Sequence, residues 1–228
     1  MNESIARETG SGIEAELYGA RFSDQETRKA RQLWKPIVRY LQRYVDVEGA
    51  TLDIGAGSCH FINLIQSTRR IAMDINVKTL EAYADPGIEC VVASAVALGQ
   101  LASSSLNSVF ASNVYEHFLN REDVSCSLHE VFRVLRSGGR FIIMQPNFRY
   151  CMKRYYDFFD HRLAFTHEAM DEAVRAVGFH IERVVPQFLP YTTKSSLPQS
   201  EALVDLYLKV PVAWKILGGQ MLLVAVKP

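Results

Sequence analysis

The residues that carry the most chemical information form one short stretch, TLDIGAGSCHF, at residues 51–61. Apolar residues suited to a buried strand lead into Gly55 and Gly57, and a helix can begin shortly after them. A strand that ends in a tight glycine turn lets its backbone approach a ligand closely, and the helix that follows offers free N–H groups. The stretch therefore predicts a turn that holds a nucleotide-type cofactor.

Dinucleotides and S-adenosylmethionine are both held by such turns, and two features separate them here. The dinucleotide pattern GxGxxG requires a third glycine, and His60 stands in its place. An acid, Asp53, also lies two residues before Gly55. Asp74, at the end of the next predicted strand, is placed to accept hydrogen bonds from both ribose hydroxyls, which suits either cofactor. The first two features favour S-adenosylmethionine, with an NAD-dependent oxidoreductase as an alternative.

The elements that must position these residues alternate along the chain. Strands are predicted at residues 50–54, 70–74, 88–92, 108–112, 140–145, 179–188 and 221–226. Helices are predicted at residues 24–45, 59–67, 77–84, 122–135, 166–177 and 201–208. Gly138 and Gly139 are expected to end the helix at 122–135 with a left-handed cap. Such alternation predicts a parallel sheet covered by helices on both faces.

Bulk composition limits the class of protein. The chain has 228 residues, of which 48% are apolar and 22% charged, as expected for one globular domain. We assign that domain to residues 24–228, after a mobile segment at residues 1–23. No signal peptide or membrane-spanning run is evident, and a cytoplasmic location is expected. The four cysteines form no CxxC pair, so neither a disulfide framework nor a zinc site is predicted, and no metal is expected.

The charge balance argues against a dedicated nucleic-acid-binding protein. Lys and Arg number 25 and so do Asp and Glu, which gives a formal net charge of zero. Basic residues nevertheless occupy much of the first predicted helix, at Arg28, Lys29, Arg31, Lys35, Arg39 and Arg43. We interpret them as a solvated face. A contact surface for an anionic substrate, lipid headgroups or RNA is the alternative.

Four motifs, in order, resemble the class I S-adenosylmethionine-dependent methyltransferases across residues 50–150. They are DIGAG at 53–57, MDIN at 73–76, SNVYEH at 112–117 and EVFRVLRSGGRFIIMQPN at 130–147. The resemblance implies a Rossmann-like, doubly wound α/β fold with a seven-stranded sheet. Strands one to five would be parallel and the last strand, Met221–Val226, antiparallel.

The same resemblance implies which residues bind the cofactor. The turn around Gly55 and Gly57 would pack against the methionine part, Asp74 would hold the ribose, and Asn113 would lie beneath the cofactor. The full set implied is Asp53, Gly55, Ala56, Gly57, Asp74, Ile75, Ser94, Ala95 and Asn113. Cys59 replaces the third glycine of the usual GxGxG, Ser94 replaces an acid common before Ala95, and Asn107 replaces another common Asp. A serine hydroxyl makes a weaker hydrogen bond to the adenine amino group than a carboxylate does.

The carboxy-terminal part, from DFFDHR at 157–162 to RVVPQFLPYTTKSSLP at 183–198, resembles a branch associated with bacterial cell-surface glycan biosynthesis. It implies a small-molecule or glycan-linked acceptor. The sulfonium already activates the methyl group, so alignment and exclusion of water are the main requirements. We favour transfer to oxygen, for which a base must take the hydroxyl proton. A non-catalytic cofactor-binding protein and an RNA methyltransferase are the alternatives.

Two histidines are candidate bases. His117 follows the fourth strand at the edge where ligands bind in open α/β sheets, although a structural role in bracing the loop is the favoured interpretation. His161 lies beside Asp157 and Asp160 and is either a base oriented by an acid or a hydrogen-bonded loop residue. Residues 147–165, rich in aromatics, are predicted to form a lid, with a second loop at 189–200. Candidate substrate-binding residues are Tyr155, Asp157, Tyr191 and Lys194.

Overall fold

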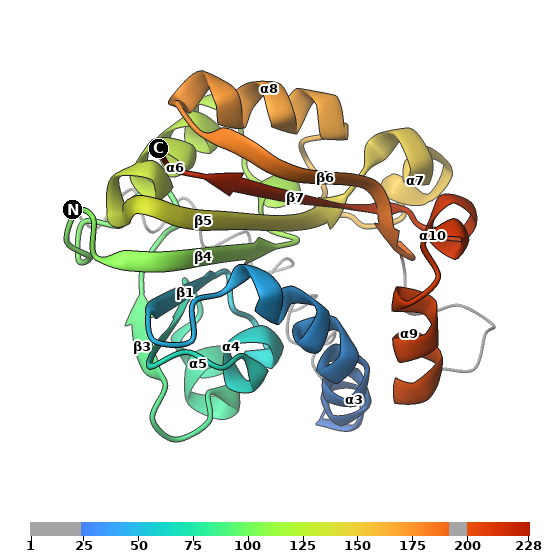
Figure 1. The fold of residues 1–228 in the computed structure, drawn as a ribbon, viewed down its shortest axis with the longest axis horizontal. Helices are drawn as coiled ribbons and strands as arrows, with labels where there is room; N and C mark the ends of the chain where they lie inside the picture. Colours follow the sequence, from blue (N-terminus) through green and yellow to red (C-terminus); the bar gives the residue numbers. More distant parts are fainter. Residues whose placement is uncertain (1–23, 192–199) are drawn as a thin grey trace.

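The computed structural model describes residues 24–191 and 200–228. The expected mobile segment at residues 1–23 and the candidate substrate residue Lys194 lie outside the described residues. Figure 1 shows the described chain as one layered domain, with a central sheet between two sets of helices.

Seven strands form a single sheet in the order β3-β2-β1-β4-β5-β7-β6. They are β1 Ala50–Ile54, β2 Arg69–Asp74, β3 Glu89–Val92, β4 Leu106–Ser112, β5 Leu135–Pro146, β6 His180–Leu189 and β7 Gln220–Val226. The pairs among β1 to β5 are parallel, and β7 runs antiparallel to both β5 and β6. The predicted fold class, including the antiparallel last strand, is confirmed.

Alternation of side chains across the strands produces two separate cores. In β5, Phe141 and Ile143 belong to one buried cluster while Ile142 belongs to the other. The first cluster includes α6 (Arg121–Val134) and α8 (His167–Val177). The second includes α3 (Asp24–Leu41), α4 (His60–Leu64) and α5 (Val77–Tyr83). Helices therefore cover both faces of the sheet, as the apolar strands require (Figure 1).

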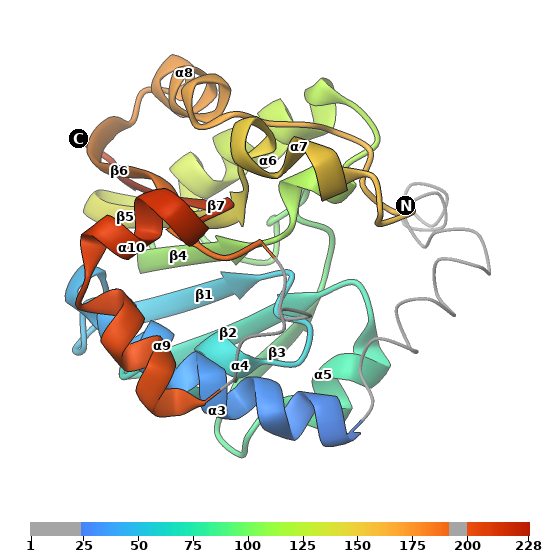
Figure 2. The ribbon, with the colours of Figure 1, turned by 90° about the vertical axis from the view of Figure 1, so that its right-hand side faces the viewer.

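The carboxyl ends of the parallel strands meet at one edge of the sheet. Register brings Ile54 of β1 beside both Met73 of β2 and Ala111 of β4. The turns that follow these strands therefore lie next to one another. In Figure 1, β4 points toward the side that carries α7 (Phe148–Tyr155), α9 (Glu201–Leu208) and α10 (Pro211–Leu217). Figure 2 views the molecule from that side, where α3, α9 and α10 lie toward the viewer.

The predicted glycine cap of α6 is wrong. The helix ends at Val134, and Leu135 already has extended backbone and begins β5. The ammonium of Lys227 instead donates to the carbonyl oxygens of Phe132 and Leu135, both at 2.7 Å. Gly138 does adopt a positive φ of 75°, but inside β5, where its N–H donates to the Lys227 carbonyl at 2.8 Å. The glycine pair thus lies where the pairing of β5 with β4 shifts register, between Leu135 and Arg140, and a distant lysine caps the helix.

Two helices were not predicted from the sequence, and others end earlier than predicted. Helix α7 falls within the expected lid at residues 147–165, and α10 follows α9 after Lys209 and Val210. Helix α4 stops at Leu64 rather than near residue 67. The predicted N-cap of α8 is confirmed, because Thr166 accepts from the Ala169 N–H and Gly178 closes the helix with φ of 113°.

Arg31, Lys35 and Arg39 of α3 meet acids of other segments. Arg39 pairs with Glu201 at 2.9 Å and with Asp205 at 3.3 Å, both on α9, and Arg31 pairs with Asp85. These pairs accompany the packing of α3 against α9. Among the described residues, no helix is long and apolar enough to cross a membrane.

Candidate active site

The turn after β1 has the backbone that its glycines predict. Gly55 and Gly57 adopt φ of 64° and 49°, in the left-handed region that favours glycine. A Cβ on Gly55 would lie 2.8 Å from Cγ2 of Val114, in the loop after β4. The Ala56 N–H donates to the carbonyl of Met73 at 2.9 Å, which ties the turn to β2. Close approach of two loops therefore requires glycine at position 55.

Asp74 anchors this turn through its carboxylate. One oxygen accepts from the Gly57 N–H and the other from the Asn76 N–H, both at 2.9 Å. The residue is only 6% exposed. These two bonds fix the position of the carboxylate at the end of β2.

Asp53 lies beside Asp74 in the interior and is 3% exposed. Burial, followed by the charge of Asp74, raises the pKa of Asp53 well above the usual carboxyl range, while a backbone hydrogen bond from Ile62 lowers it. Two carboxylates thus share one poorly solvated region under the turn. That arrangement favours a ligand with positive charge nearby.

The loops after β3 and β4 flank the turn. The Ser94 hydroxyl accepts from the Val96 N–H at 3.3 Å, and its own hydrogen can be donated to a further acceptor. Ala95 is half-buried against the core. Asn113 is exposed with φ of 54°, a conformation that asparagine tolerates, and its N–H donates to the Met144 carbonyl at 2.9 Å. Ile75 is 41% exposed at the end of β2.

The geometry of this edge fits S-adenosylmethionine. A glycine turn that admits no Cβ approaches a ligand at the end of β1, and a fixed carboxylate follows at the end of β2. The predicted cofactor residues come from the ends of β1, β2, β3 and β4 and therefore line one edge of the sheet. Asp74 would hold the ribose hydroxyls, and the turn around Gly55 would receive the methionine part.

The candidate bases His117 and His161 come together beside this edge. Their ring centroids lie 5.2 Å apart. His117 ends a short 3₁₀ turn, Tyr115–His117, while His161 lies in the irregular segment between α7 and α8. Backbone hydrogen bonds join the two segments, because the carbonyl of Glu116 accepts from the N–H groups of Arg162 at 2.8 Å and Leu163 at 3.1 Å.

Hydrogen bonds assign the tautomers of both rings. Nδ1 of His117 lies 3.0 Å from the carbonyl oxygen of Asp160, which can only accept, so Nδ1 carries the hydrogen. The hydroxyl of Tyr191 donates to the Tyr155 carbonyl at 3.2 Å and lies 3.4 Å from Nδ1 of His161. His161 therefore also donates from Nδ1. In both rings the lone pair resides on Nε2.

Glu116 is a site residue that the sequence pattern did not single out. It is 1% exposed, and neither carboxylate oxygen has a hydrogen-bond partner among the described residues. Burial raises the pKa of Glu116, the charge of Asp160 adds to that rise, and His117 lowers it. Its position beside a histidine just after a buried strand was the available signal.

The candidate substrate residues differ in their surroundings. Tyr155 is buried and its hydroxyl donates to the Leu163 carbonyl, so it braces the segment that carries His161. Tyr191 is half-buried, and its hydroxyl faces His161. Asp157 is exposed and lies 3.5 Å from Arg154. The Phe158 ring stacks on His161 at 5.1 Å between centroids.

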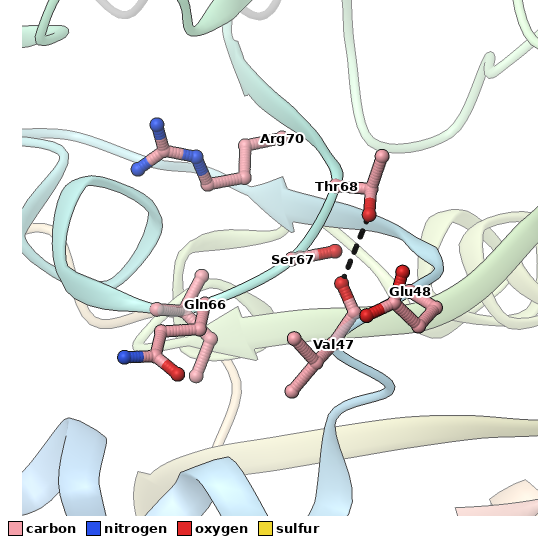
Figure 3. Close-up of a pocket in the computed structure, with 7 residues that line it drawn as sticks. Val47, Glu48, Gln66, Ser67, Thr68 and Arg70 are labelled. Atoms are coloured by element: carbon pink, nitrogen blue, oxygen red, sulfur yellow. Dashed lines mark hydrogen bonds between the residues drawn. The ribbon is translucent and has the colours of Figure 1, made fainter.

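A separate cavity lies away from these residues. It has a volume of about 380 Å³ and is lined by Val47, Glu48, Ile65, Gln66, Ser67, Thr68 and Arg70. These residues precede or begin β1 and β2, so the cavity lies at the amino edge of the sheet (Figure 3). The Thr68 hydroxyl donates across it to the Val47 carbonyl at 3.2 Å. Its lining includes none of the predicted site residues that the structure describes.

Comparison with known proteins agrees with the geometry. Residues 52–143 match a family described as a methyltransferase domain. A S-adenosylmethionine-dependent methyltransferase from Archaeoglobus fulgidus shares 19% identity, with a TM-score of 0.67 over 95% of this chain and 100% of that chain. One from Thermotoga maritima shares 17% identity, with a TM-score of 0.65 over 94% and 96%.

A third structure, from Haloferax volcanii, contains the Trm112 methyltransferase activator in complex. The matched chain of that structure shares 15% identity with this chain, with a TM-score of 0.68 over 92% of this chain and 97% of that chain. No curated protein sequence matches the chain. The matched domain, the sheet order and the turn beside Asp74 lead to one conclusion. Residues 52–143 match the methyltransferase-domain family, and the chain has the fold of S-adenosylmethionine-dependent methyltransferases of known structure.

Proposed function

We propose that the protein transfers the methyl group to an oxygen of a small-molecule or glycan-linked acceptor, and that His161 and His117 act on that acceptor. The observation that carries the proposal is the pair of imidazoles beside the end of β4, both with the lone pair on Nε2. A hydroxyl acceptor needs such a base, because its proton must leave as the new bond forms.

In this proposal, separate residues bind the cofactor, remove the acceptor proton and orient the base. S-adenosylmethionine supplies a methyl group on a positively charged sulfur, which makes the methyl electrophilic. Asp74 and the Gly55 turn hold and orient the cofactor. Nε2 of His161 takes the hydroxyl proton while the Tyr191 hydroxyl holds the ring through Nδ1. His117 is oriented by Asp160 and supports the same site.

The glycan-linked acceptor is supported by exposed aromatic side chains on the segment that carries His161. Tyr156 and Phe159 are 63% and 69% exposed on the segment after α7. Exposed rings on the segment that carries a candidate base suit the apolar faces of a sugar. Residues 147–165 would then serve as the acceptor-side lid, together with the loop at 189–200, of which residues 192–199 lie outside the described part of the chain.

Cofactor binding is tested by calorimetric titration with S-adenosylmethionine, S-adenosylhomocysteine and NAD. We expect the first two to bind and NAD not to bind. Asp74→Ala should weaken binding at least about tenfold, or roughly 1.4 kcal/mol, as expected for loss of charge-assisted hydrogen bonds. Asp171→Ala, which removes a surface acid of α8, is the matched control. Failure of both adenosyl ligands to bind a folded sample would favour a non-catalytic protein.

The acceptor is tested with cofactor labelled in the methyl group and a panel of monosaccharides and nucleotide sugars. Transfer to a hydroxyl oxygen gives a methyl ether that survives mild alkali, whereas transfer to a carboxylate oxygen gives a methyl ester that releases methanol. His161→Ala should lower kcat by about 10²-fold or more while cofactor affinity stays unchanged. His129→Ala, on the exposed face of α6, controls for loss of any histidine. Methyl transfer only to amines would contradict the oxygen acceptor.

A further inference from the structure

Three potential ligand groups gather on the acceptor side of the site. Among the described residues, Glu116, His117 and His161 each offer one ligand atom, and these atoms all lie within 4.8 Å of one another. Glu116 and His117 are adjacent, whereas His161 comes from the segment between α7 and α8. The sequence expectation of no metal rested on cysteine spacing and did not address this combination of a carboxylate and two imidazoles.

The carboxylate of Glu116 lacks the partners that a buried acid needs. Both its oxygens are buried without a hydrogen bond from any described residue. An isolated carboxylate in such a place is costly, and buried charges are normally paired or bound to a metal. The side chain lies within reach of two imidazoles, so a cation placed between them would satisfy it.

Each imidazole already has the outer hydrogen-bond partner typical of a metal ligand. His117 donates from Nδ1 to the Asp160 carbonyl at 3.0 Å, and a carboxylate oxygen of Asp160 lies 3.5 Å away. His161 donates from Nδ1 to the Tyr191 hydroxyl at 3.4 Å. Metal-binding histidines usually donate their other ring N–H in this way, which fixes the ring and raises its basicity. The ligand atom is then Nε2 in both rings.

We propose that Glu116, His117 and His161 bind a divalent transition-metal ion of the zinc class. Two imidazoles and one carboxylate are a ligand set of catalytic zinc sites, which keep further positions for water or substrate. Tetrahedral ligands at about 2.1 Å from the metal are about 3.4 Å apart, so the cluster must contract on binding.

The consequence for catalysis rests on the proposed function. A bound cation would take the acceptor hydroxyl as a ligand and lower its pKa, so that the proton leaves to solvent as the oxygen attacks the methyl group. His161 would then be a ligand and not a base. The two roles are exclusive for Nε2, and metal content decides between them.

Metal binding is measured without cofactor or acceptor, on the untagged full chain after treatment with a chelator. Titration with Zn²⁺ under reducing conditions should show one tight equivalent, and Co²⁺ should give visible absorption bands of a four- or five-coordinate site. His161→Ala and Glu116→Gln should each weaken binding at least about tenfold. Tyr191→Phe should weaken it less, since it removes only a contact to the far side of the His161 ring. His129→Ala should bind like the wild type.

The outcomes separate the metal site from the methyltransferase assignment. Absence of a tight equivalent, or one that persists in both His161→Ala and Glu116→Gln, overturns the metal site. Cofactor titration of the same samples then still tests the proposed function. Thermal unfolding of each variant checks that it is folded, and His161→Ala, in a partly exposed segment, keeps the test valid if Glu116→Gln fails to fold.

Discussion

At the residue scale, the turn after β1 shows which positions are set by backbone geometry and which by charge. Gly55 is held to glycine by both its positive φ and the contact with Val114. Asp53 is placed where its charge is unfavourable, beside Asp74 in the interior. Substitution of Gly55 should therefore lower the free energy of unfolding, whereas neutralisation of Asp53 should raise it.

Gly55→Ala should destabilise the protein more than Gly87→Ala. Gly87 has φ of 88°, but a Cβ there would meet nothing within 4 Å, so its substitution adds only backbone strain, about 1 kcal/mol. Gly55→Ala adds a 2.8 Å clash with Val114 to similar strain. Urea unfolding of both variants measures the difference. Val114→Ala should recover part of the loss in the Gly55→Ala background, and equal losses for Gly55→Ala and Gly87→Ala would contradict the clash.

Asp53→Asn should raise stability at neutral pH. Because the pKa of Asp53 is raised in the folded state, the folded protein binds more protons than the unfolded chain between the two pKa values. Stability from this group is present at low pH and is lost as pH rises from the ordinary carboxyl pKa of about 3.9 through the folded value. The advantage of Asp53→Asn in urea unfolding should therefore grow as the pH rises above the ordinary carboxyl pKa of about 3.9. A difference independent of pH would contradict the raised pKa.

At the element scale, contacts from distant parts of the chain decide where several helices and strands end. The element types and most strand positions follow from periodicity and turn residues. The end of α6 does not, because the group that caps it is 92 residues from Leu135 along the chain. Helices α7 and α10 have eight and seven residues, too short to show a clear apolar period.

Lys227→Met should destabilise α6 and the sheet beside it. The ammonium satisfies two carbonyl oxygens at 2.7 Å and lies 4.7 Å from the Phe132 ring. Loss of these charge-assisted hydrogen bonds should cost about 1–2 kcal/mol of unfolding free energy in urea. Lys215→Met, an exposed lysine of α10, should change it by less than about 0.5 kcal/mol. Equal effects of the two substitutions would show that Lys227 is not a cap.

At the scale of the whole molecule, the balance of charge bears on the class of acceptor. The net charge is zero, and basic side chains of α3 are paired with acids of α9. A polynucleotide would have to compete with those acids. This arrangement favours a small or glycan-linked acceptor over RNA.

The RNA alternative is tested by fluorescence anisotropy with a labelled RNA. We expect no saturable binding at about 0.15 M salt, because the Arg39 guanidinium is already paired with acids and would have to exchange them for phosphate. The double variant Glu201→Gln and Asp205→Asn releases Arg39 and should bind RNA more strongly than the wild type at low salt. Tight wild-type binding that falls steeply with salt would instead support an RNA methyltransferase.

The parts of the site differ in how far sequence could predict them. The cofactor side depends on short spacings, such as Gly55 to Gly57, and on acids at strand ends, so local pattern is sufficient to predict it. The acceptor side depends on one contact, in which Glu116 and His117 meet the segment at Asp160 to Leu163. His117 and His161 were separate candidates in the sequence, and nothing in their spacing indicates that they meet.

The sequence by itself determined the sheet, its helical cover and the S-adenosylmethionine turn, because apolar periodicity and glycine backbone freedom act over a few residues. Tertiary structure alone decided the cap on α6, the pairing of α3 with α9 and the gathering of Glu116 with two histidines. These depend on side chains that approach only after the layers pack. Burial of the Glu116 carboxylate is the clearest case, since neither its solvation nor its neighbours can be read from adjacent residues.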